Sequence, residues 1–130
     1  MKLSPLKFDK IIAAVPIIQG GMAVKISTAP LAAAVANEGG IGLIGASGMQ
    51  PEELRREIRL AHALSPNGVI GVNIMVAARQ FPKLVQAAID EKIDLIVAGA
   101  GFSRDVFALG KEAGVPVAPI VSSAKLAKLS

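Results

Sequence analysis

The residues best suited to chemistry in this sequence are small side chains and one amide, placed where apolar segments end. Small residues let backbone N–H and C=O groups approach a flat or charged ligand closely. An asparagine amide can both donate and accept hydrogen bonds. Five segment ends of this kind favour a planar cofactor lying across them. The five groups are Gly20–Met22, Gly45–Gly48, Asn73–Met75, Ala98–Gly101 and Ser122–Ser123.

Each of these groups also has a purely structural explanation. Turns between strands and helices are often rich in glycine, and Asn73 could tie a loop to the backbone. The stretch 99–105 lacks the third glycine of the dinucleotide-binding fingerprint, and no acidic residue follows at the expected distance. The sequence also contains no GxxxxGK[ST] phosphate-binding loop. The cofactor prediction therefore rests on the five ends taken together.

Groups that could act as acids, bases, nucleophiles or metal ligands are few. The only histidine, His62, falls late in a predicted helix, where we expect a surface residue rather than a catalytic one. Asp94 opens a predicted strand, at the end opposite to the one where parallel α/β folds bind ligands. There is no cysteine, which excludes thiol catalysis, disulfides and cysteine-bound metals. We therefore predict no catalytic residue and no metal site in this chain.

The elements that must position these residues alternate along the chain. Short, continuous apolar runs are typical of strands buried on both faces, and helical patterns separate them. Alternation of this kind predicts an α/β fold of parallel βα repeats with right-handed crossovers, in one domain over residues 1–130. The predicted strands are 16–19, 41–45, 69–75, 94–98 and 116–121, and the predicted helices are 28–38, capped by Thr28, 51–64, 82–92, 104–113 and a short one from Ser123.

Composition narrows the class of protein. Hydrophobic residues make up 52% of the 130 residues, so a buried core is expected. Aromatic residues make up 3%, and the basic residues behind the net charge of +4 are scattered, so we expect no nucleic-acid partner. No apolar run has the length of a membrane helix. Residues 11–18 match a signal core in length, but Asp9 and the missing cleavage pattern argue against one. We expect a cytoplasmic protein.

Four stretches of the sequence resemble the nitronate monooxygenase family. They are "PIIQGGM", "LAAAVANEGGIGLIGASG", "GVNIMVA" and "APIVSSAKLAK", in the order that the family shows, and the resemblance covers about residues 10–130. These enzymes, once called 2-nitropropane dioxygenases, depend on FMN and are related to the FMN-dependent enoyl-acyl-carrier-protein reductases. The family's substrates are alkyl nitronates, oxidised with O₂, or enoyl thioesters, reduced with electrons from NAD(P)H.

The resemblance implies a fold and a set of cofactor-binding residues. The family's fold is a TIM barrel, of which this chain would supply about five of the eight strands. In the family, the Gly-Gly-Met turn after the first strand lies against the flavin, and the asparagine of the third strand hydrogen-bonds it. The small turn after the fourth strand lines the same cavity. The residues implied here are Gly20, Gly21, Met22, Asn73, Gly99 and Gly101.

The sequence also departs from the family's pattern. The family's catalytic histidine lies in a Gly-Gly-His stretch after the next strand, and its phosphate-binding glycine turns follow strands 7 and 8. Neither feature occurs in this sequence, and Lys25 adds a long charged side chain just after the flavin-facing turn. We therefore expect the N-terminal part of such an enzyme, inactive alone, which forms a homo-oligomer or lacks a C-terminal half. The alternatives are a fragment of an FMN-dependent enoyl-acyl-carrier-protein reductase and a non-catalytic, flavodoxin-like binding module.

Overall fold

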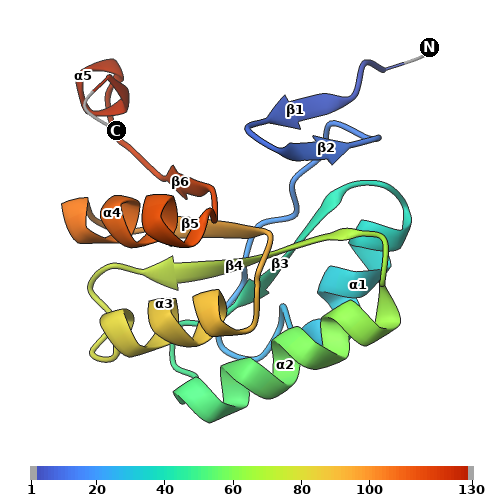
Figure 1. Ribbon diagram of the computed structural model, residues 1–130, viewed down its shortest axis with the longest axis horizontal. Helices are drawn as coiled ribbons and strands as arrows, with labels where there is room; N and C mark the ends of the chain where they lie inside the picture. Colours follow the sequence, from blue (N-terminus) through green and yellow to red (C-terminus); the bar gives the residue numbers. More distant parts are fainter. Residues whose placement is uncertain (1–2, 129–130) are drawn as a thin grey trace.

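The computed structural model describes residues 3–128 and contains a parallel sheet with helices on its outer side (Figure 1). The predicted alternation of strands and helices is confirmed from residue 29 onward. The sheet has the order β3-β4-β5-β6. Its strands are β3 (Ile41–Gly45), β4 (Val69–Met75), β5 (Leu95–Gly99) and β6 (Val117–Pro119). The helices are α1 (Ala29–Asn37), α2 (Pro51–Leu64), α3 (Phe81–Asp90), α4 (Arg104–Ala113) and α5 (Ala124–Ala127).

The strand order distinguishes a barrel from a doubly wound sheet. Each strand pairs in parallel with the next one along the chain, and Ile18 adds a parallel bridge to Ile41 at the edge of β3. A flavodoxin-like sheet would place the first strand between the second and the third and would carry helices on both faces. Here successive helices from α1 to α4 pack against one another around one side. The flavodoxin-like alternative is therefore wrong, and the fold is part of a TIM barrel.

The predicted first strand is only partly formed. Residues 16–19 make two backbone hydrogen bonds to β3: Ile41 N donates to Ile17 O at 2.9 Å, and Gln19 N donates to Ile41 O at 3.0 Å. Pro16 has no N–H to donate, and no strand pairs with the other side of this segment within residues 3–128. The segment therefore lies at the sheet edge as a single bridge rather than as a strand.

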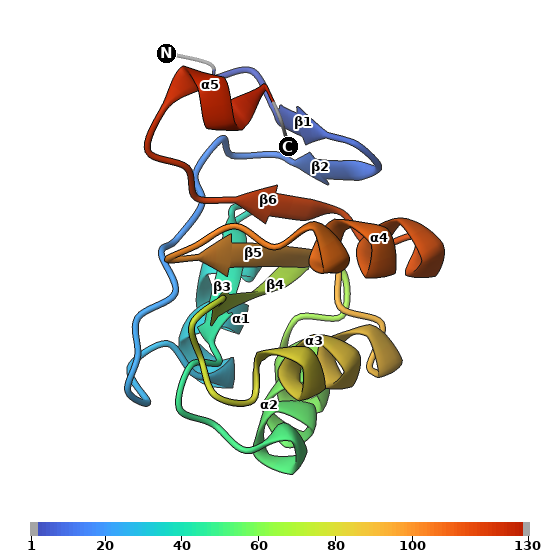
Figure 2. The same cartoon turned by 90° about the vertical axis from the view of Figure 1, so that its left-hand side faces the viewer.

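An N-terminal hairpin, which the sequence analysis did not predict, covers one end of the sheet. It consists of β1 (Leu6–Phe8) and β2 (Ile11–Ala13), paired antiparallel. Both views place it on the opposite side of the sheet from α2 and α3 (Figure 2). Lys10 in its turn donates a hydrogen bond to the carbonyl of Gly114, just before β6. The hairpin thus covers the amino ends of the strands and leaves their carboxyl ends uncovered.

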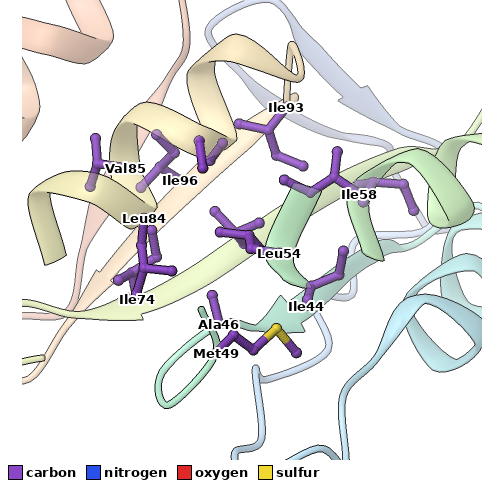
Figure 3. Close-up of a cluster of buried hydrophobic side chains, with 14 of the residues drawn as sticks. Ile44, Ala46, Met49, Leu54, Ile58, Ile74, Leu84, Val85, Ile93 and Ile96 are labelled. Atoms are coloured by element: carbon purple, nitrogen blue, oxygen red, sulfur yellow. The ribbon is translucent and has the colours of Figure 1, made fainter. Parts of the chain in front are cut away.

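The two faces of the sheet build two separate hydrophobic clusters. On the outer face, isoleucines of the strands pack against α2 and α3, and Figure 3 shows Leu54, Ile58, Leu84 and Val85 gathered around Ile44, Ile74 and Ile96. On the inner face, the hairpin covers a smaller cluster: Ile11, Ala13, Ile41, Leu43, Leu95 and Val97. Because side chains alternate along a strand, Ile70, Val72 and Ile74 of β4 face outward. Asn73 therefore lies on the inner face.

Helix α1 begins differently from the prediction. Thr28 is the N-cap residue, but its side chain makes no capping hydrogen bond. Instead, the Glu57 carboxylate of α2 accepts a hydrogen bond from Ala29 N at 2.7 Å. A carboxylate on a neighbouring helix thus satisfies an amide that would otherwise lack a partner, and it also suits the positive end of the helix dipole. Among residues 3–128, no helix combines the length and the apolar character that crossing a bilayer requires.

Candidate functional site

Three of the implied residues meet at the carboxyl ends of the strands. Asn73 is in register with Gly45 of β3, and Gly99 is in register with Met75, two residues further along β4. A Cβ placed on Gly21 would lie 2.3 Å from Asn73 Cβ, and one placed on Gly99 would lie 3.4 Å from Asn73 Oδ1. The backbone therefore approaches the amide closely from both sides. We call the cluster of Gly21, Gly45, Asn73 and Gly99, in which Gly45 and Gly99 are buried, the glycine floor.

The Asn73 side chain is available to a ligand. It is half-buried, and it makes no hydrogen bond to any residue in the range 3–128. The backbone carbonyl of Asn73 accepts from Ala46 N at 2.9 Å, so the backbone alone provides the link to the neighbouring loop. The structural explanation of Asn73, in which the side chain ties a loop to the backbone, is therefore wrong. An amide without a partner between glycines is suited to hydrogen-bond a flat molecule lying on the floor.

The Gly20–Met22 turn is held by two polar residues that the sequence analysis missed. The Ser27 hydroxyl accepts from Met22 N and from Gln19 Nε2, both at 2.9 Å, and donates to Gly20 O at 3.3 Å. Gln19 Oε1 in turn accepts from Leu43 N at 3.1 Å. Ser27 is fully buried, so these bonds form in a medium of low dielectric constant. The polar Gln19 at the end of an apolar run is the signal that could have indicated this network.

The other implied residues lie around this floor. A Cβ on Gly20 would meet no atom within 4 Å, and the Met22 side chain is exposed. The Met22 carbonyl instead approaches Gly45, where a Cβ would lie 2.6 Å away. Gly101, at φ +147°, packs against the side chain of Val76. The structure thus brings Gly21, Asn73 and Gly99 together, adds Gly45, which was not among the implied residues, and leaves Gly101 at the periphery.

Lys25 does not disturb this arrangement. Its ammonium group forms an ion pair with the Glu53 carboxylate of α2, with an Nζ–Oε1 distance of 3.1 Å. The hydrogen bond from Lys25 is the main reason that the pKa of Glu53 lies below its ordinary value. The long charged side chain that follows the turn is therefore directed to the outer helix layer and away from the floor.

His62 and Asp94 lie together at the opposite end of the sheet. His62 Nε2 is 3.8 Å from Asp94 Oδ2, and the same oxygen accepts a hydrogen bond from Ile70 N at 2.9 Å. Both partners adjoin the amino ends of β4 and β5, whereas the glycine floor lies at the carboxyl ends. The hydrogen bond from Ile70 joins Asp94 to the start of β4, and His62 near the end of α2 lies beside it.

The residues of the glycine floor fit a flavin ring but not its phosphate. A Cβ on Gly21 or Gly45 would collide with Asn73 or with the Met22 backbone, and one on Gly99 would touch the Asn73 amide. The amide itself offers an NH₂ donor group and a carbonyl acceptor. None of the four residues carries a charge, whereas a phosphate requires cationic or several amide donors. The floor therefore suits the isoalloxazine ring, and the phosphate of such a cofactor would have to bind elsewhere.

The fold is part of a parallel β/α barrel, and the glycine floor is a candidate ligand site at the carboxyl ends of its strands. The family model "Nitronate monooxygenase" matches residues 4–82, which is more than half of the chain. The chain therefore belongs to the nitronate monooxygenase family. This membership confirms the family resemblance, and the matched residues contain three of the four sequence stretches, all but "APIVSSAKLAK".

Individual relatives agree with this assignment. The chain is 43% identical over 65 residues to a probable nitronate monooxygenase of Staphylococcus aureus, a match that covers 50% of this chain and 18% of that protein. It is 31% identical over 113 residues to the (3aS,4S,5R,7aS)-5-hydroxy-7a-methyl-1-oxo-octahydro-1H-indene-4-carboxyl-CoA dehydrogenase of Rhodococcus jostii, covering 87% of this chain and 31% of that protein. The solved structure of FabK from Thermotoga maritima superposes with a TM-score of 0.83 at 38% identity.

The chain is shorter than these relatives. The superposition on FabK covers 88% of this chain but 36% of that one, and the matches to the two curated relatives cover less still of their length. The chain thus spans about a third of the barrel enzymes that it resembles. Membership of this family indicates that the chain is part of an oxidoreductase of the FMN type.

Proposed function

We propose that this chain forms the flavin-facing part of an FMN-dependent oxidoreductase of the nitronate monooxygenase type, whose substrates are alkyl nitronates and O₂. The observation that carries the proposal is the Asn73 amide, which has no partner within residues 3–128 and lies between Gly21 and Gly99 at the carboxyl ends of adjacent strands. Membership of the family supports it independently.

Each residue of the floor has a role in this proposal. Bound FMN would supply reversible electron transfer between the nitronate and O₂. Gly21 and Gly45 let the turn pack directly on Asn73 and on the end of β3, and Gly99 lets β5 lie close to the Asn73 amide. Asn73 orients the ring through its amide, and Ser27 holds the turn that carries Gly21 in place. The geometry thus provides binding and orientation, and we assign no proton transfer to any residue of this chain.

We further propose that the chain is inactive alone and requires the rest of the barrel, supplied by a C-terminal half or by a second copy. A complete barrel takes about 250 residues and eight strands. The sheet ends in two edges that lack a strand partner within residues 3–128, at residues 16–19 and at β6. Ile17, Ile18 and Ile120 lie at these edges and are 55%, 49% and 57% exposed. Uncovered edges with apolar side chains favour association with further strands.

The solution mass of the purified chain tests this requirement. Light scattering coupled to size exclusion would give an oligomer or a concentration-dependent mass if the edges associate. A monodisperse, stable monomer of 130 residues would contradict self-association and leave no role for a second copy.

A second candidate function is the FMN-dependent reduction of an enoyl thioester. The observation that favours it is the Rhodococcus jostii relative, which is named as a carboxyl-CoA dehydrogenase and matches 87% of this chain. The same glycine floor would serve both reactions, because both use the exposed face of a flavin ring. The two candidates differ in the second substrate, which is O₂ in the first case and NAD(P)H in the second.

The visible absorption spectrum of the purified chain tests the proposal. Addition of FMN should change the flavin band only at high concentration, because the phosphate site is not part of the floor. Nitronate-dependent O₂ uptake should stay at the level of free FMN. An unchanged flavin spectrum at every FMN concentration would contradict flavin binding, and rapid nitronate oxidation by the chain alone would contradict its inactivity.

A further inference from the structure

A second site, separate from the glycine floor, lies on the rim of the sheet. It is a pocket of about 760 Å³ between the loop that follows β3 and the start of α3. Two of its side chains are basic, two are amides and none is acidic. The lining residues are Gly48, Met49, Gln50, Ala78, Arg79, Gln80, Pro82, Lys83 and Leu84.

The two basic side chains of this pocket have no anionic partner. Neither Arg79 nor Lys83 forms an ion pair with any residue in the range 3–128. By contrast, two arginines of the neighbouring helix α2 do have anionic partners at the carboxyl end of α3. Arg55 pairs with Asp90, and Arg59 pairs with Glu91. Two unpaired cations on one pocket create a positive potential that attracts an anion with more than one charge.

The two amide side chains add hydrogen-bond donors to the same pocket. Gln80 Nε2 donates to Gln50 Oε1 at 2.7 Å, across the gap between the start of α2 and the start of α3. This bond uses one of the four N–H groups of the two amides. Neither glutamine side chain caps its own helix. Neutral donors beside two cations are the combination that phosphate oxygens require.

The pocket is connected to the glycine floor by one short loop. Ala46 N donates to the Asn73 carbonyl at 2.9 Å, and the Ser47 hydroxyl accepts from Met75 N at 3.0 Å. Gly48, which lines the pocket, is two residues beyond Ala46, so at most about 8 Å of chain separates the two positions. A ligand that extends over this loop would reach from the pocket to the floor.

We propose that this pocket binds the diphosphate of an organic substrate or electron donor whose reactive end lies at the glycine floor. Arg79 provides a planar, two-pronged contact to phosphate oxygens, and Lys83 provides a point charge. A volume of about 760 Å³ exceeds what one phosphate needs and leaves room for the group attached to it. The placement of the reactive end rests on the proposed function, whereas binding of the diphosphate does not.

Coenzyme A thioesters and NAD(P)H both carry a diphosphate, and the experiment distinguishes them. Inorganic pyrophosphate, coenzyme A, NADPH and FMN are each titrated into the ¹⁵N-labelled full chain, and backbone amide shifts are followed. Pyrophosphate should shift the amides of Gly48, Arg79, Gln80 and Lys83 and leave those of Gly21 and Asn73 unchanged. Of coenzyme A and NADPH, the natural ligand should shift both groups and bind at least tenfold more tightly than pyrophosphate.

A pair of double variants isolates the pocket from general charge effects. Arg79→Gln with Lys83→Gln should weaken pyrophosphate binding at least tenfold. The control is Lys92→Gln with Lys111→Gln, which also removes two positive charges. These lysines lie near the carboxyl ends of α3 and α4 and do not line the pocket, so the affinity should change less than twofold.

Three results would overturn the proposal. They are an equal loss of affinity in both double variants, pyrophosphate shifts that map outside the pocket, and displacement of pyrophosphate by FMN, which would make the pocket the flavin's own phosphate site. Because pyrophosphate binding is independent of the floor, failure of the flavin proposal alone would leave the pocket shifts intact.

Discussion

Gly21 packs against Asn73 so closely that the contact leaves no space for a side chain. A Cβ on Gly21 would lie 2.3 Å from Asn73 Cβ and 3.1 Å from its Cγ. The contact joins two positions that are 52 residues apart in the chain. Gly21 lies in the turn after residues 16–19, and Asn73 lies on the inner face of β4. This contact explains why the sequence places a glycine at that position.

Substitution of Gly21 by alanine should disrupt this contact. The added methyl group would force the turn or Asn73 to move, and overpacking of this kind typically destabilises by about 1–3 kcal/mol. Gly20→Ala is the matched control, because the same methyl group on the preceding residue meets no atom within 4 Å. Urea unfolding followed by circular dichroism should separate the two variants by at least about 1 kcal/mol. Equal stabilities would contradict the packing described here.

Asn73→Leu should separate ligand binding from stability. Leucine has a similar size and removes an amide that has no partner within the described residues. The free energy of unfolding should stay the same or rise, because a half-buried polar group is replaced by an apolar one. FMN affinity should fall about tenfold, which corresponds to one lost hydrogen bond of about 1.4 kcal/mol.

The control for Asn73 is Asn67→Leu, at an exposed turn before β4. It should leave FMN affinity unchanged when both variants are titrated with FMN under the same conditions. A large loss of stability in Asn73→Leu would show that the amide has a structural partner instead.

The two buried serines should respond in opposite ways to alanine. The Ser27 hydroxyl has three hydrogen-bond partners, whereas the Ser65 hydroxyl, equally buried, has none within residues 3–128. Ser27→Ala leaves buried donors and acceptors without partners, so it should destabilise by about 1–3 kcal/mol. Ser65→Ala should be neutral or stabilising. The midpoints of urea unfolding measure both, and a greater loss in Ser65→Ala would refute the network around Gln19.

Acid should weaken the contact between helices α2 and α3. Hydrogen bonds from Arg59 hold the pKa of Glu91 below its ordinary value of 4.5, and a bond from Arg55 does the same for the pKa of Asp90, ordinarily 3.8. A carboxyl group with a lowered pKa in the folded state contributes stability above its unfolded pKa. That contribution is lost as the pH falls through the folded value. Stability should therefore decline from about pH 4.5 downward.

Glu91→Gln tests the origin of this acid sensitivity. The variant should show a smaller decline of the urea midpoint between pH 6 and pH 3 than the unmodified chain. Glu38→Gln serves as the control, since Glu38 forms no ion pair in the part of the chain that the structure describes. Identical pH profiles for the Glu91 and Glu38 variants would assign the sensitivity to other groups.

The sheet was predictable where the sequence signal is local. Residues 41–45 and 69–75 form strands with the predicted bounds because continuous β-branched and small residues suit a sheet buried on both faces. Gly114 ends α4 in the left-handed conformation that glycine adopts readily. By contrast, the hairpin of β1 and β2 depends on its packing against the inner cluster. Its three-residue strands are too short to give a clear periodic signal.

The contacts within the candidate site could not be predicted from the sequence. The family resemblance implied Gly21, Asn73 and Gly99 as cofactor-binding residues, which stays a prediction, and the structure brings these three together. Their closeness depends on the register of β3, β4 and β5, which no local pattern specifies. The capping of α1 by Glu57 and the bonds of Ser27 are likewise contacts between distant residues.

The measurement that tests the central claim most directly is a titration of the ¹⁵N-labelled chain with riboflavin, followed through the Asn73 side-chain amide. Riboflavin carries the flavin ring without a phosphate, so it probes the glycine floor alone. The account predicts saturable shifts of the Asn73 side-chain amide and of the backbone amides of Gly21, Gly45 and Gly99. Unshifted Asn73 signals up to the solubility limit of riboflavin, or shifts confined to other parts of the chain, would contradict it.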